Sequence, residues 1–332
     1  MPTIGVFVPI NSDQDLMKPE ERPVGRAALS LMDRGIVTIF GDQITAQTNG
    51  QIEMTGLCAH PGVWRPITKP ISAMHDRYPS QRRSKHHKSV QRKLGATPLA
   101  NPISVTSLCR DKLSCQRFLE RQGIVMPPVE DDPKHFQARL TEWGSGFIKP
   151  RYGALGTGVR SVQAHDTLPA RIEGVVPGVL EPPILQRSVP APDGWAGRAV
   201  RTLVQRTSVA SWHFCESVVR QSRTDLVVNA ARGAQVRCGS DALSDATRSE
   251  ISCLSQRICA AFETHPDGQW IVELGLDFMI DPEGHPQLIE VNSRPRGRLE
   301  VLATLHPSRF VDDHVRACGR PLEYLASLTA TP

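Results

Sequence analysis

Apolar and polar positions alternate along the first hundred residues in a way that predicts strands joined by a helix. The apolar runs Thr3–Val8 and Ile36–Phe40 are typical of buried strands. Between them, apolar residues at helical spacing predict a helix over Val24–Arg34. The segment Gln51–Leu57 alternates polar and apolar residues, as a half-exposed strand does. This order of elements predicts an open α/β unit over residues 1–105.

The pattern changes beyond residue 105 and predicts two further units. Thr106 or Ser107 can cap a helix that continues to about Gln122, where a glycine ends it. We expect this helix to belong to a small middle unit that extends to residue 182. A third unit, residues 183–332, ends in a helix of about twenty residues. The predicted fold class is therefore α/β, in several packed units.

The composition is that of an ordinary folded protein. Of 332 residues, 39% are hydrophobic and 22% are charged, which provides enough apolar mass for a core and excludes a wholly disordered chain. No apolar run reaches the roughly 18 residues that a membrane-spanning helix needs. The N-terminus lacks the basic segment and the long apolar run of a signal peptide. We therefore expect a cytoplasmic protein that has no membrane partner.

The charge balance is only mildly basic. The 39 basic and 34 acidic residues give a formal charge of +5, which suits anionic small molecules as well as it suits nucleic acid. Part of the excess lies between Arg82 and Lys93, but this stretch has no interleaved aromatic residues and no recognised nucleic-acid-binding module. A solvated helix face or loop is the simpler interpretation. We expect no nucleic-acid partner.

The eight cysteines show no spacing typical of a metal site. None lies in a C-x-x-C pair, and none is combined with histidine at ligand spacing. Most are flanked by apolar or small residues, as reduced thiols in the core of an intracellular protein are. The cysteines therefore predict neither a zinc site nor catalysis by a thiol nucleophile.

The segment around Lys149 is the first that predicts chemistry. A short apolar strand leads to this lysine, and glycines follow at positions 153, 156 and 158. Glycines let backbone amides approach phosphate oxygens, and a lysine supplies a compensating charge. The order is not that of the Walker motif, because the lysine precedes the glycines. A phosphate-binding loop and a tight turn with an exposed lysine both stay open on this pattern alone.

Residues 273–295 predict a β-hairpin, because two apolar runs flank the turn-forming segment Asp281–Gly284. Side chains alternate along a strand, so each strand should present one apolar face to the core. The residues expected on that face are Leu276, Phe278 and Ile280 of the first strand and Ile289 and Val291 of the second.

Three oxygen-bearing side chains, Asp277, Glu290 and Asn292, lie on the other face of this hairpin. They converge if the pairing register sets the two apolar faces together. Carboxylate and amide oxygens suit Mg²⁺ that keeps water ligands and bridges nucleotide phosphates. Two carboxylates on one face also repel each other unless a cation or a proton lies between them. The alternative is the solvated polar face of an edge hairpin.

Together, these segments resemble the ATP-grasp superfamily, which includes D-alanine–D-alanine ligase and glutathione synthetase. The likeness covers roughly residues 65–305 and keeps the order of the segments, from Asp111-Lys112 through the lysine–glycine loop to the hairpin. The stretches Ser72–Tyr78 and Glu273–Asp277 are most similar to the spore-coat-associated YheC/YheD branch. The resemblance implies an ATP-grasp fold that is preceded by a Rossmann-like pre-ATP-grasp domain.

The resemblance also implies how the chain would bind ATP and Mg²⁺, with Mn²⁺ as a substitute. The nucleotide would lie between a central subdomain, residues 106–182, and a C-terminal subdomain, residues 183–332. The implied nucleotide contacts are Lys112, Lys149, Gly153, Gly156, Gly158, Gln186, Arg187, Val189 and Asp193, and the implied metal ligands are Asp277, Glu290 and Asn292. The implied catalytic residues, which steady the transferred phosphate, are Arg201 and Arg232, with Arg294 as a further anion contact.

The chain departs from the family pattern near the expected pocket for the substrate acid. Gly275 stands where D-alanine–D-alanine ligase has an arginine, and Ala199 stands where the family often has an acidic residue. Arg294 is an alternative source of a guanidinium group, which binds carboxylates through two hydrogen bonds. A solvent-exposed loop arginine is the other interpretation of Arg294.

The activity that the resemblance implies is that of an ADP-forming carboxylate–amine ligase. Such an enzyme forms an amide or peptide bond through an acyl-phosphate, and the acid would be an amino acid or another small carboxylate. Two alternatives stay open, namely an ATP-binding, coat-like structural protein without turnover and an ATP-grasp kinase that forms no amide. The expected partners are small-molecule carboxylates and amines, including amino acids or short peptides, and a homodimer is compatible with the resemblance.

Overall fold

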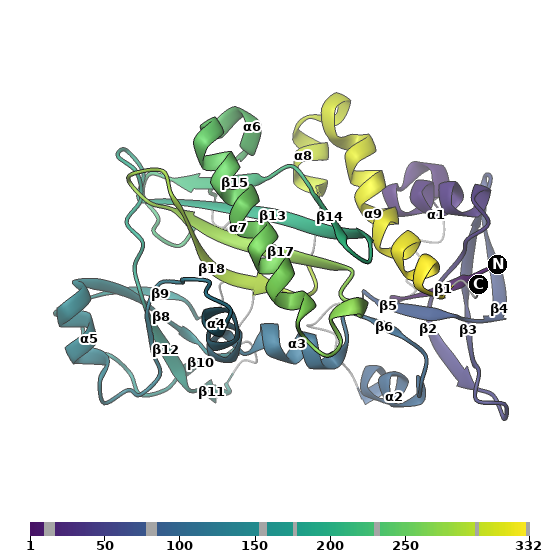
Figure 1. The fold of residues 1–332 in the computed structure, drawn as a ribbon, viewed down its shortest axis with the longest axis horizontal. Helices are drawn as coiled ribbons and strands as arrows, with labels where there is room; N and C mark the ends of the chain where they lie inside the picture. The colour runs from purple at the N-terminus through teal and green to yellow at the C-terminus, as the bar shows by residue number, and fades with distance from the viewer. Residues whose placement is uncertain are drawn as a thin grey trace.

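The computed structural model shows a mixed α/β protein, which confirms the predicted fold class (Figure 1). A six-stranded sheet near the N-terminus is followed along the chain by a four-stranded sheet and then by a second six-stranded sheet. The structure describes residues 1–9, 17–77, 85–152, 158–174, 178–228, 233–295 and 299–329, and for residues 85–88 it describes the backbone only.

The N-terminal sheet contains β1 (Thr3–Phe7), β2 (Val37–Ala46), β3 (Ile52–His60), β4 (Val63–Pro70), β5 (Ala73–Asp76) and β6 (Leu99–Ala100), and its helices are η2 (Pro19–Glu21), α1 (Pro23–Asp33) and α2 (Lys85–Lys93). Its strand order is β4-β3-β2-β1-β5-β6, and β1 pairs parallel with both β2 and β5. The predicted strands and the predicted helix over 24–34 are confirmed. The pattern does not predict β4, which carries Pro66 and Pro70, and a sheet tolerates prolines at an edge strand.

The single helix predicted over residues 107–122 is two helices in the structure, α3 (Ile103–Arg110) and α4 (Lys112–Arg121). The break falls at Asp111, whose side chain accepts a hydrogen bond from the Ser114 amide at 3.2 Å. An aspartate in this position satisfies an amide that has no partner within its own helix. The prediction of one continuous helix is therefore wrong, and Lys112 is the first residue of a new helix.

The four-stranded sheet contains β7 (Val129–Glu130), β12 (Pro183–Arg187), β8 (Ser145–Pro150) and β9 (Arg160–Gln163) in that order, with α5 (Phe136–Trp143) beside it and with β10 (Ile172–Glu173) and β11 (Leu180–Glu181) as a separate pair. On the α5 face, Leu140 packs against Ile148 and Leu185. Because side chains alternate along a strand, the next residues, Lys149 on β8 and Gln186 on β12, lie on the opposite face.

The C-terminal sheet contains β16 (Gln235–Cys238), β15 (Val218–Ser222), β13 (Gly197–Ser208), β17 (Glu273–Ile280) and β18 (Pro286–Asn292) in that order, with β14 (Ser211–Phe214) paired to β13. The nearby helices are α6 (Gly239–Ala242), α7 (Asp245–Glu263), η5 (Gly268–Trp270), α8 (Glu300–Leu305) and α9 (Pro307–Thr329). The α7 helix lies across one face of the sheet (Figure 1), where Ile258 and Phe262 pack against Leu276 and Phe278.

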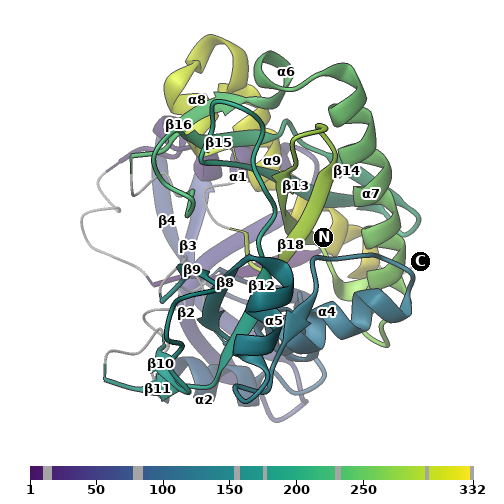
Figure 2. The ribbon, with the colours of Figure 1, turned by 90° about the vertical axis from the view of Figure 1, so that its left-hand side faces the viewer.

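The terminal helix α9, whose presence was predicted, packs against the N-terminal sheet. Leu322 and Leu325 share a buried cluster with Ile4 and Leu31, so the end of the chain and its beginning have a common core. In Figure 2, β8 and β12 lie beneath β18, and the polar faces of two sheets therefore approach each other at this place. The predicted boundary between residues 182 and 183 falls immediately before β12, and the division into three units stays a prediction.

The hairpin of β17 and β18 contains a β-bulge that the sequence pattern does not reveal. Asp277 pairs with Glu290, but the next residue, Phe278, pairs with Leu288, so Ile289 is the extra residue of the bulge. The expected inward orientation of Ile289 is wrong for this reason, and fully buried Leu288 takes its place in the core. The bulge keeps the apolar face continuous and leaves Glu290 opposite Asp277.

All eight cysteines are free thiols, and only Cys253 is exposed. This agrees with the prediction of reduced core thiols. In the described part of the chain, no helix is both long enough and apolar enough to cross a lipid bilayer.

Candidate functional site

The polar face of the β17–β18 hairpin brings together the three side chains that the strand period predicts there. Asp277 and Glu290 are directly opposite each other in the two strands. The side-chain amide of Asn292 donates a hydrogen bond to Asp277 Oδ2 at 2.8 Å. Their proximity is a property of the structure, whereas their role as metal ligands stays a prediction.

The Asp277 carboxylate is held by two arginines from neighbouring strands. Arg201 on β13 donates from Nε to Oδ1 at 2.7 Å and from Nη2 to Oδ2, and Arg220 on β15 donates from Nη2 to Oδ1 at 3.1 Å. With the amide of Asn292, these contacts fill the roughly four acceptor positions of a carboxylate. The charge of Asp277 is therefore fully compensated within the protein.

Two lysines lie beside this hairpin. Lys112, at the start of α4, has its Nζ 3.7 Å from Glu290 Oε1. Buried Lys149 donates to Gln186 Oε1 at 2.7 Å. Burial first, and then the nearby charge of Lys112, lowers the pKa of Lys149 to about 8, although Glu290 acts in the opposite direction. These effects place both lysines and Glu290 in one electrostatic neighbourhood.

This neighbourhood has an excess of positive charge. Four basic groups, those of Lys112, Lys149, Arg201 and Arg220, stand against the two carboxylates of Asp277 and Glu290. The pKa of Arg220 is lowered. Burial is the main cause and the adjacent Arg201 adds to it, although the Asp277 carboxylate acts in the opposite direction. Like charges held together in a buried place favour an anion among them. The site is therefore suited to phosphate or carboxylate groups.

The contact of Arg220 with Asp277 was not predicted from the sequence, and the space beside Gly275 is filled by another residue. A Cβ atom on Gly275 would lie 3.0 Å from the Cβ of Pro295, so Pro295 occupies the space of a side chain there. Arg220 brings a guanidinium group to Asp277 from β15 instead. Arg220 directly follows two valines in the strand Val218–Ser222, which gave no specific signal for this contact.

Arg294, another predicted anion contact, is paired with an acidic residue of the N-terminal sheet. Its Nη2 lies 2.6 Å from Oδ2 of Asp76, whose side chain is completely buried. Arg294 therefore connects the end of the hairpin to β5 in this structure. A role for Arg294 toward substrate stays a prediction.

The remaining predicted nucleotide contacts have mixed locations. Val189 is half-buried just beyond β12, whereas Asp193 is exposed in a turn. Gly158 has a φ of +73°, and a Cβ there would lie 2.6 Å from the carbonyl oxygen of Glu173, so only glycine fits. Three predicted residues, Gly153, Gly156 and Arg232, lie outside the described residues.

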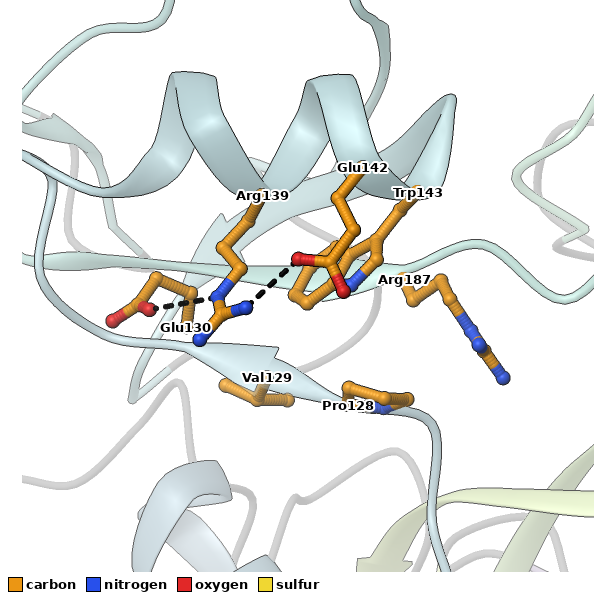
Figure 3. A pocket seen from close by; sticks show the side chains of 7 residues that line it. All are labelled: Pro128, Val129, Glu130, Arg139, Glu142, Trp143 and Arg187. Atoms are coloured by element: carbon orange, nitrogen blue, oxygen red, sulfur yellow. Dashed lines mark hydrogen bonds and ion pairs between the residues drawn. The ribbon is translucent and has the colours of Figure 1, made fainter.

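A cavity of about 430 Å³ lies on the α5 side of the four-stranded sheet (Figure 3). In it, Arg139 bridges Glu130 at 3.5 Å and Glu142 at 2.8 Å. Arg187 extends away from this group, and it points to the face opposite to that of Gln186. The lining residues are Pro128, Val129, Glu130, Arg139, Glu142, Trp143 and Arg187. The cavity is therefore separate from the cluster around Asp277.

Comparison with known protein families finds a match over the C-terminal part of the chain. Residues 196–328 match the model of the family described as "YheC/D like ATP-grasp". No curated protein sequence matches the chain.

Similar solved structures cover nearly the whole chain at low identity. D-alanyl-alanine synthetase A from Vibrio cholerae is 12% identical with a TM-score of 0.55, and the match covers 97% of this chain and 98% of that one. The VanG D-Ala:D-Ser ligase from Enterococcus faecalis is 13% identical with a TM-score of 0.55, and the match covers 99% of each chain. A RiPP-associated ATP-grasp ligase from Chryseobacterium gregarium is 12% identical with a TM-score of 0.57, and the match covers 100% of this chain and 98% of that one. The chain therefore has the ATP-grasp fold, and its residues 196–328 match the YheC/D-like form of that fold.

Proposed function

We propose that the chain is an ATP-dependent, ADP-forming ligase that joins a carboxylate to an amine. The observation that carries this proposal is the cluster of basic groups around the β17–β18 hairpin. Two lysines and two arginines converge there on Asp277 and Glu290. Such an arrangement can hold a triphosphate and the anionic acid that receives its terminal phosphoryl group.

The nucleotide would lie between the four-stranded sheet and the hairpin. In this proposal, Lys112 and Lys149 contact the phosphates, and the chain from Gln186 to Val189 contacts the adenine. Gly153, Gly156 and Gly158 are proposed as further phosphate contacts, and Gly158 has the left-handed backbone that lets amides turn toward an anion.

The donor atoms of the hairpin fit a hard divalent cation best at Glu290 and Asn292. Asn292 commits its amide nitrogen to Asp277, which leaves its carbonyl oxygen for a cation. Glu290 is partly exposed, and its ion-pair contact with Lys112 is long at 3.7 Å. Asp277 would join these ligands only after it releases a guanidinium group. When bound, Mg²⁺ or Mn²⁺ would compensate the charge of the phosphates.

The proposed reaction has two steps, in which the acid is first activated by phosphorylation and then joined to the amine. A carboxylate oxygen of the acid attacks the γ-phosphorus of ATP, the bond to the bridging oxygen breaks, and ADP leaves. An amine then attacks the acyl carbon, phosphate leaves with the former carboxylate oxygen, and the nitrogen loses a proton. Arg201 and Arg220 would stabilise the charge on the transferred phosphoryl group. No nucleophilic side chain is required.

The proposed acid is an amino acid, a short peptide or another small carboxylate. The names of similar structures, which include a D-Ala:D-Ser ligase and a RiPP-associated ligase, support this class. A cytoplasmic location is proposed with it, because the reaction needs ATP and because free thiols suit a reducing compartment. The proposal involves neither nucleic acid nor a membrane, and a homodimer stays a prediction.

The proposal is tested by phosphate release from Mg·ATP across a matrix of amino acids, peptides and amines. We expect release only when acid and amine are both present, together with a conjugate of the expected mass. Hydroxylamine should intercept the activated acid as a hydroxamate. The E290A variant should lose this activity, whereas E142A, in the cavity on the other face, should keep it.

The other outcomes separate the alternatives. ATP binding without stimulation by any acid would favour the coat-like structural protein. A phosphorylated product without an amide would favour a kinase. Full activity of a folded E290A variant would contradict the assignment of the hairpin as the metal site.

A further inference from the structure

The junction between α3 and α4 is fixed by the side chain of Asp111. Its Oδ1 accepts a hydrogen bond from the Ser114 amide at 3.2 Å, and its Oδ2 accepts one from the Ser114 hydroxyl at 2.9 Å. These contacts define where α4 begins. They therefore define the position of Lys112, which is the first residue of that helix.

The same carboxylate forms a two-point ion pair with Arg151, forty residues further along the chain. Arg151 Nε donates to Asp111 Oδ1 at 2.8 Å, and Arg151 Nη2 donates to Oδ2 at 2.7 Å. The backbone adds a third connection, because the amide of Lys112 donates to the carbonyl oxygen of Arg151 at 3.1 Å. Parallel hydrogen bonds between a guanidinium and a carboxylate set distance and orientation together.

Each residue of this pair lies within two positions of one of the two lysines. Lys112 follows Asp111 directly, and Lys149 is two residues before Arg151 at the end of β8. The two lysines carry like charges, and the charge of Lys112 lowers the pKa of Lys149. Holding them close before an anion arrives requires a tether, and the Asp111–Arg151 pair joins the segments that carry them.

We propose that Asp111 and Arg151 are a positioning pair that preorganises Lys112 and Lys149 for the phosphates of a nucleotide. The inference rests on the proposed function, because it takes ATP as the ligand of the two lysines. The pair itself does not touch the nucleotide. It acts by removing motions that the lysines would otherwise lose on binding, and preorganisation of this kind increases affinity.

The test uses variants that remove the ion pair and preserve the helix cap. Asparagine is as good a cap as aspartate, so D111N keeps an acceptor for the Ser114 amide but loses the charge and one of the two acceptor oxygens for Arg151. R151Q removes the partner, and R151K keeps a charge but loses the two-point geometry. R117Q is the matched control, because Arg117 on the same helix forms an exposed ion pair with Asp131 at 3.2 Å. The probes are AMP, ADP and Mg·ATP, measured by calorimetry.

We expect D111N and R151Q each to weaken Mg·ATP binding roughly tenfold. The affinity of the double variant for Mg·ATP should be no lower than that of the single variant with the lower affinity. The loss should grow from AMP to ADP to ATP, because the pair acts on phosphate contacts. R151K should recover part of the affinity, and R117Q should bind within about twofold of the parent protein.

Four outcomes would overturn the inference. They are an unchanged affinity of D111N, additive losses in the double variant, an equal loss for all three nucleotides, and a lower unfolding temperature as the only effect. If the parent protein binds no nucleotide, the proposed function fails as well. If the parent binds ATP and D111N binds it equally well, only the positioning pair is disproved.

Discussion

At the scale of single residues, Lys149 is the group whose charge should respond most directly to pH. Burial and the adjacent Lys112 lower the pKa of Lys149 to about 8, against the opposite effect of Glu290. Phosphate favours the charged lysine, which becomes scarce in the free protein as the pH rises above 8. The affinity for Mg·ATP should therefore fall between pH 7 and pH 9.5, by up to about tenfold per pH unit above the pKa.

Calorimetry across this pH range checks the prediction. Measurements in buffers with different ionisation enthalpies should also detect proton uptake on binding near pH 8.5. The control is K149R, in which the charge stays in place throughout this range. A parent protein whose affinity has the same pH dependence as that of K149R would contradict the prediction.

A second prediction concerns Arg220 and the cation. Arg220 occupies one acceptor position of Asp277, at 3.1 Å, and adds a positive charge beside it. Removing this group in R220Q should free one oxygen lone pair and reduce repulsion of a divalent cation. We expect Mn²⁺ to bind without nucleotide about fivefold more tightly, which corresponds to about 1 kcal/mol.

Titration calorimetry with Mn²⁺ measures this effect. R237Q is the matched control, because Arg237 is on the neighbouring strand and points to the other face of the sheet. D277N should lose the gain when it is combined with R220Q. An R220Q variant that binds Mn²⁺ as weakly as the parent protein would show that Arg220 does not compete with the cation.

The difference between Arg220 and the hairpin residues shows what the sequence can predict about the site. The convergence of Asp277, Glu290 and Asn292 follows from strand period and one turn, which are local features. The contact of Arg220 depends instead on two strand pairings, of β15 with β13 and of β13 with β17. No local pattern encodes such pairings, so the second guanidinium was not predicted.

At the scale of elements, strands and helices with a clear hydrophobic period in the first hundred residues were predicted, whereas the long strand β13 and the long helix α7 were not. Strand β1 and helix α1 have clear hydrophobic periods, and both were correct to within one residue at each end. The break at Asp111 was missed, because a helix cap and an ordinary helical aspartate look alike until the ion pair with Arg151 is known. The bulge at Ile289 was missed because period alone assumes a regular ladder.

Gly275 allows an element-scale prediction about the packing of β17. Its missing side chain makes room for Pro295, whose Cβ would be 3.0 Å from a new Cβ. The G275A variant must therefore push Pro295 outward within a buried region, and we expect unfolding to become easier by about 1–3 kcal/mol. Urea denaturation measures this change.

The companion variant G275A/P295G should recover part of that loss, because glycine removes the Cβ that the new side chain would meet. The single variant P295G serves as the baseline. Equal losses with and without Pro295 would mean that the strain at position 275 has another origin.

At the scale of the whole molecule, a buried ionic contact joins the N-terminal sheet to the C-terminal sheet. Glu273, at the start of β17, is fully buried and lies 2.7 Å from Nη1 of Arg77, which directly follows β5. Its other oxygen accepts a hydrogen bond from Gln205 at 2.9 Å. A second ion pair, between Asp76 and Arg294, runs beside it. The hairpin that carries the candidate site is thus tied to the first hundred residues at both of its strands.

This arrangement predicts that stability and function are coupled through Glu273. Removing one partner of a buried ion pair leaves the other charge poorly compensated, and the cost is about 3–5 kcal/mol. E273A should therefore strongly destabilise the whole chain, whereas E273Q keeps the hydrogen-bonding shape and should cost less. The exposed E283A, in the turn of the same hairpin, is the control. Urea denaturation followed by tryptophan fluorescence provides the measurement, because Trp270 is close in sequence to β17 and packs against the N-terminal core. If E273A were as stable as E283A, the contact of Glu273 with Arg77 would be dispensable for holding the two sheets together.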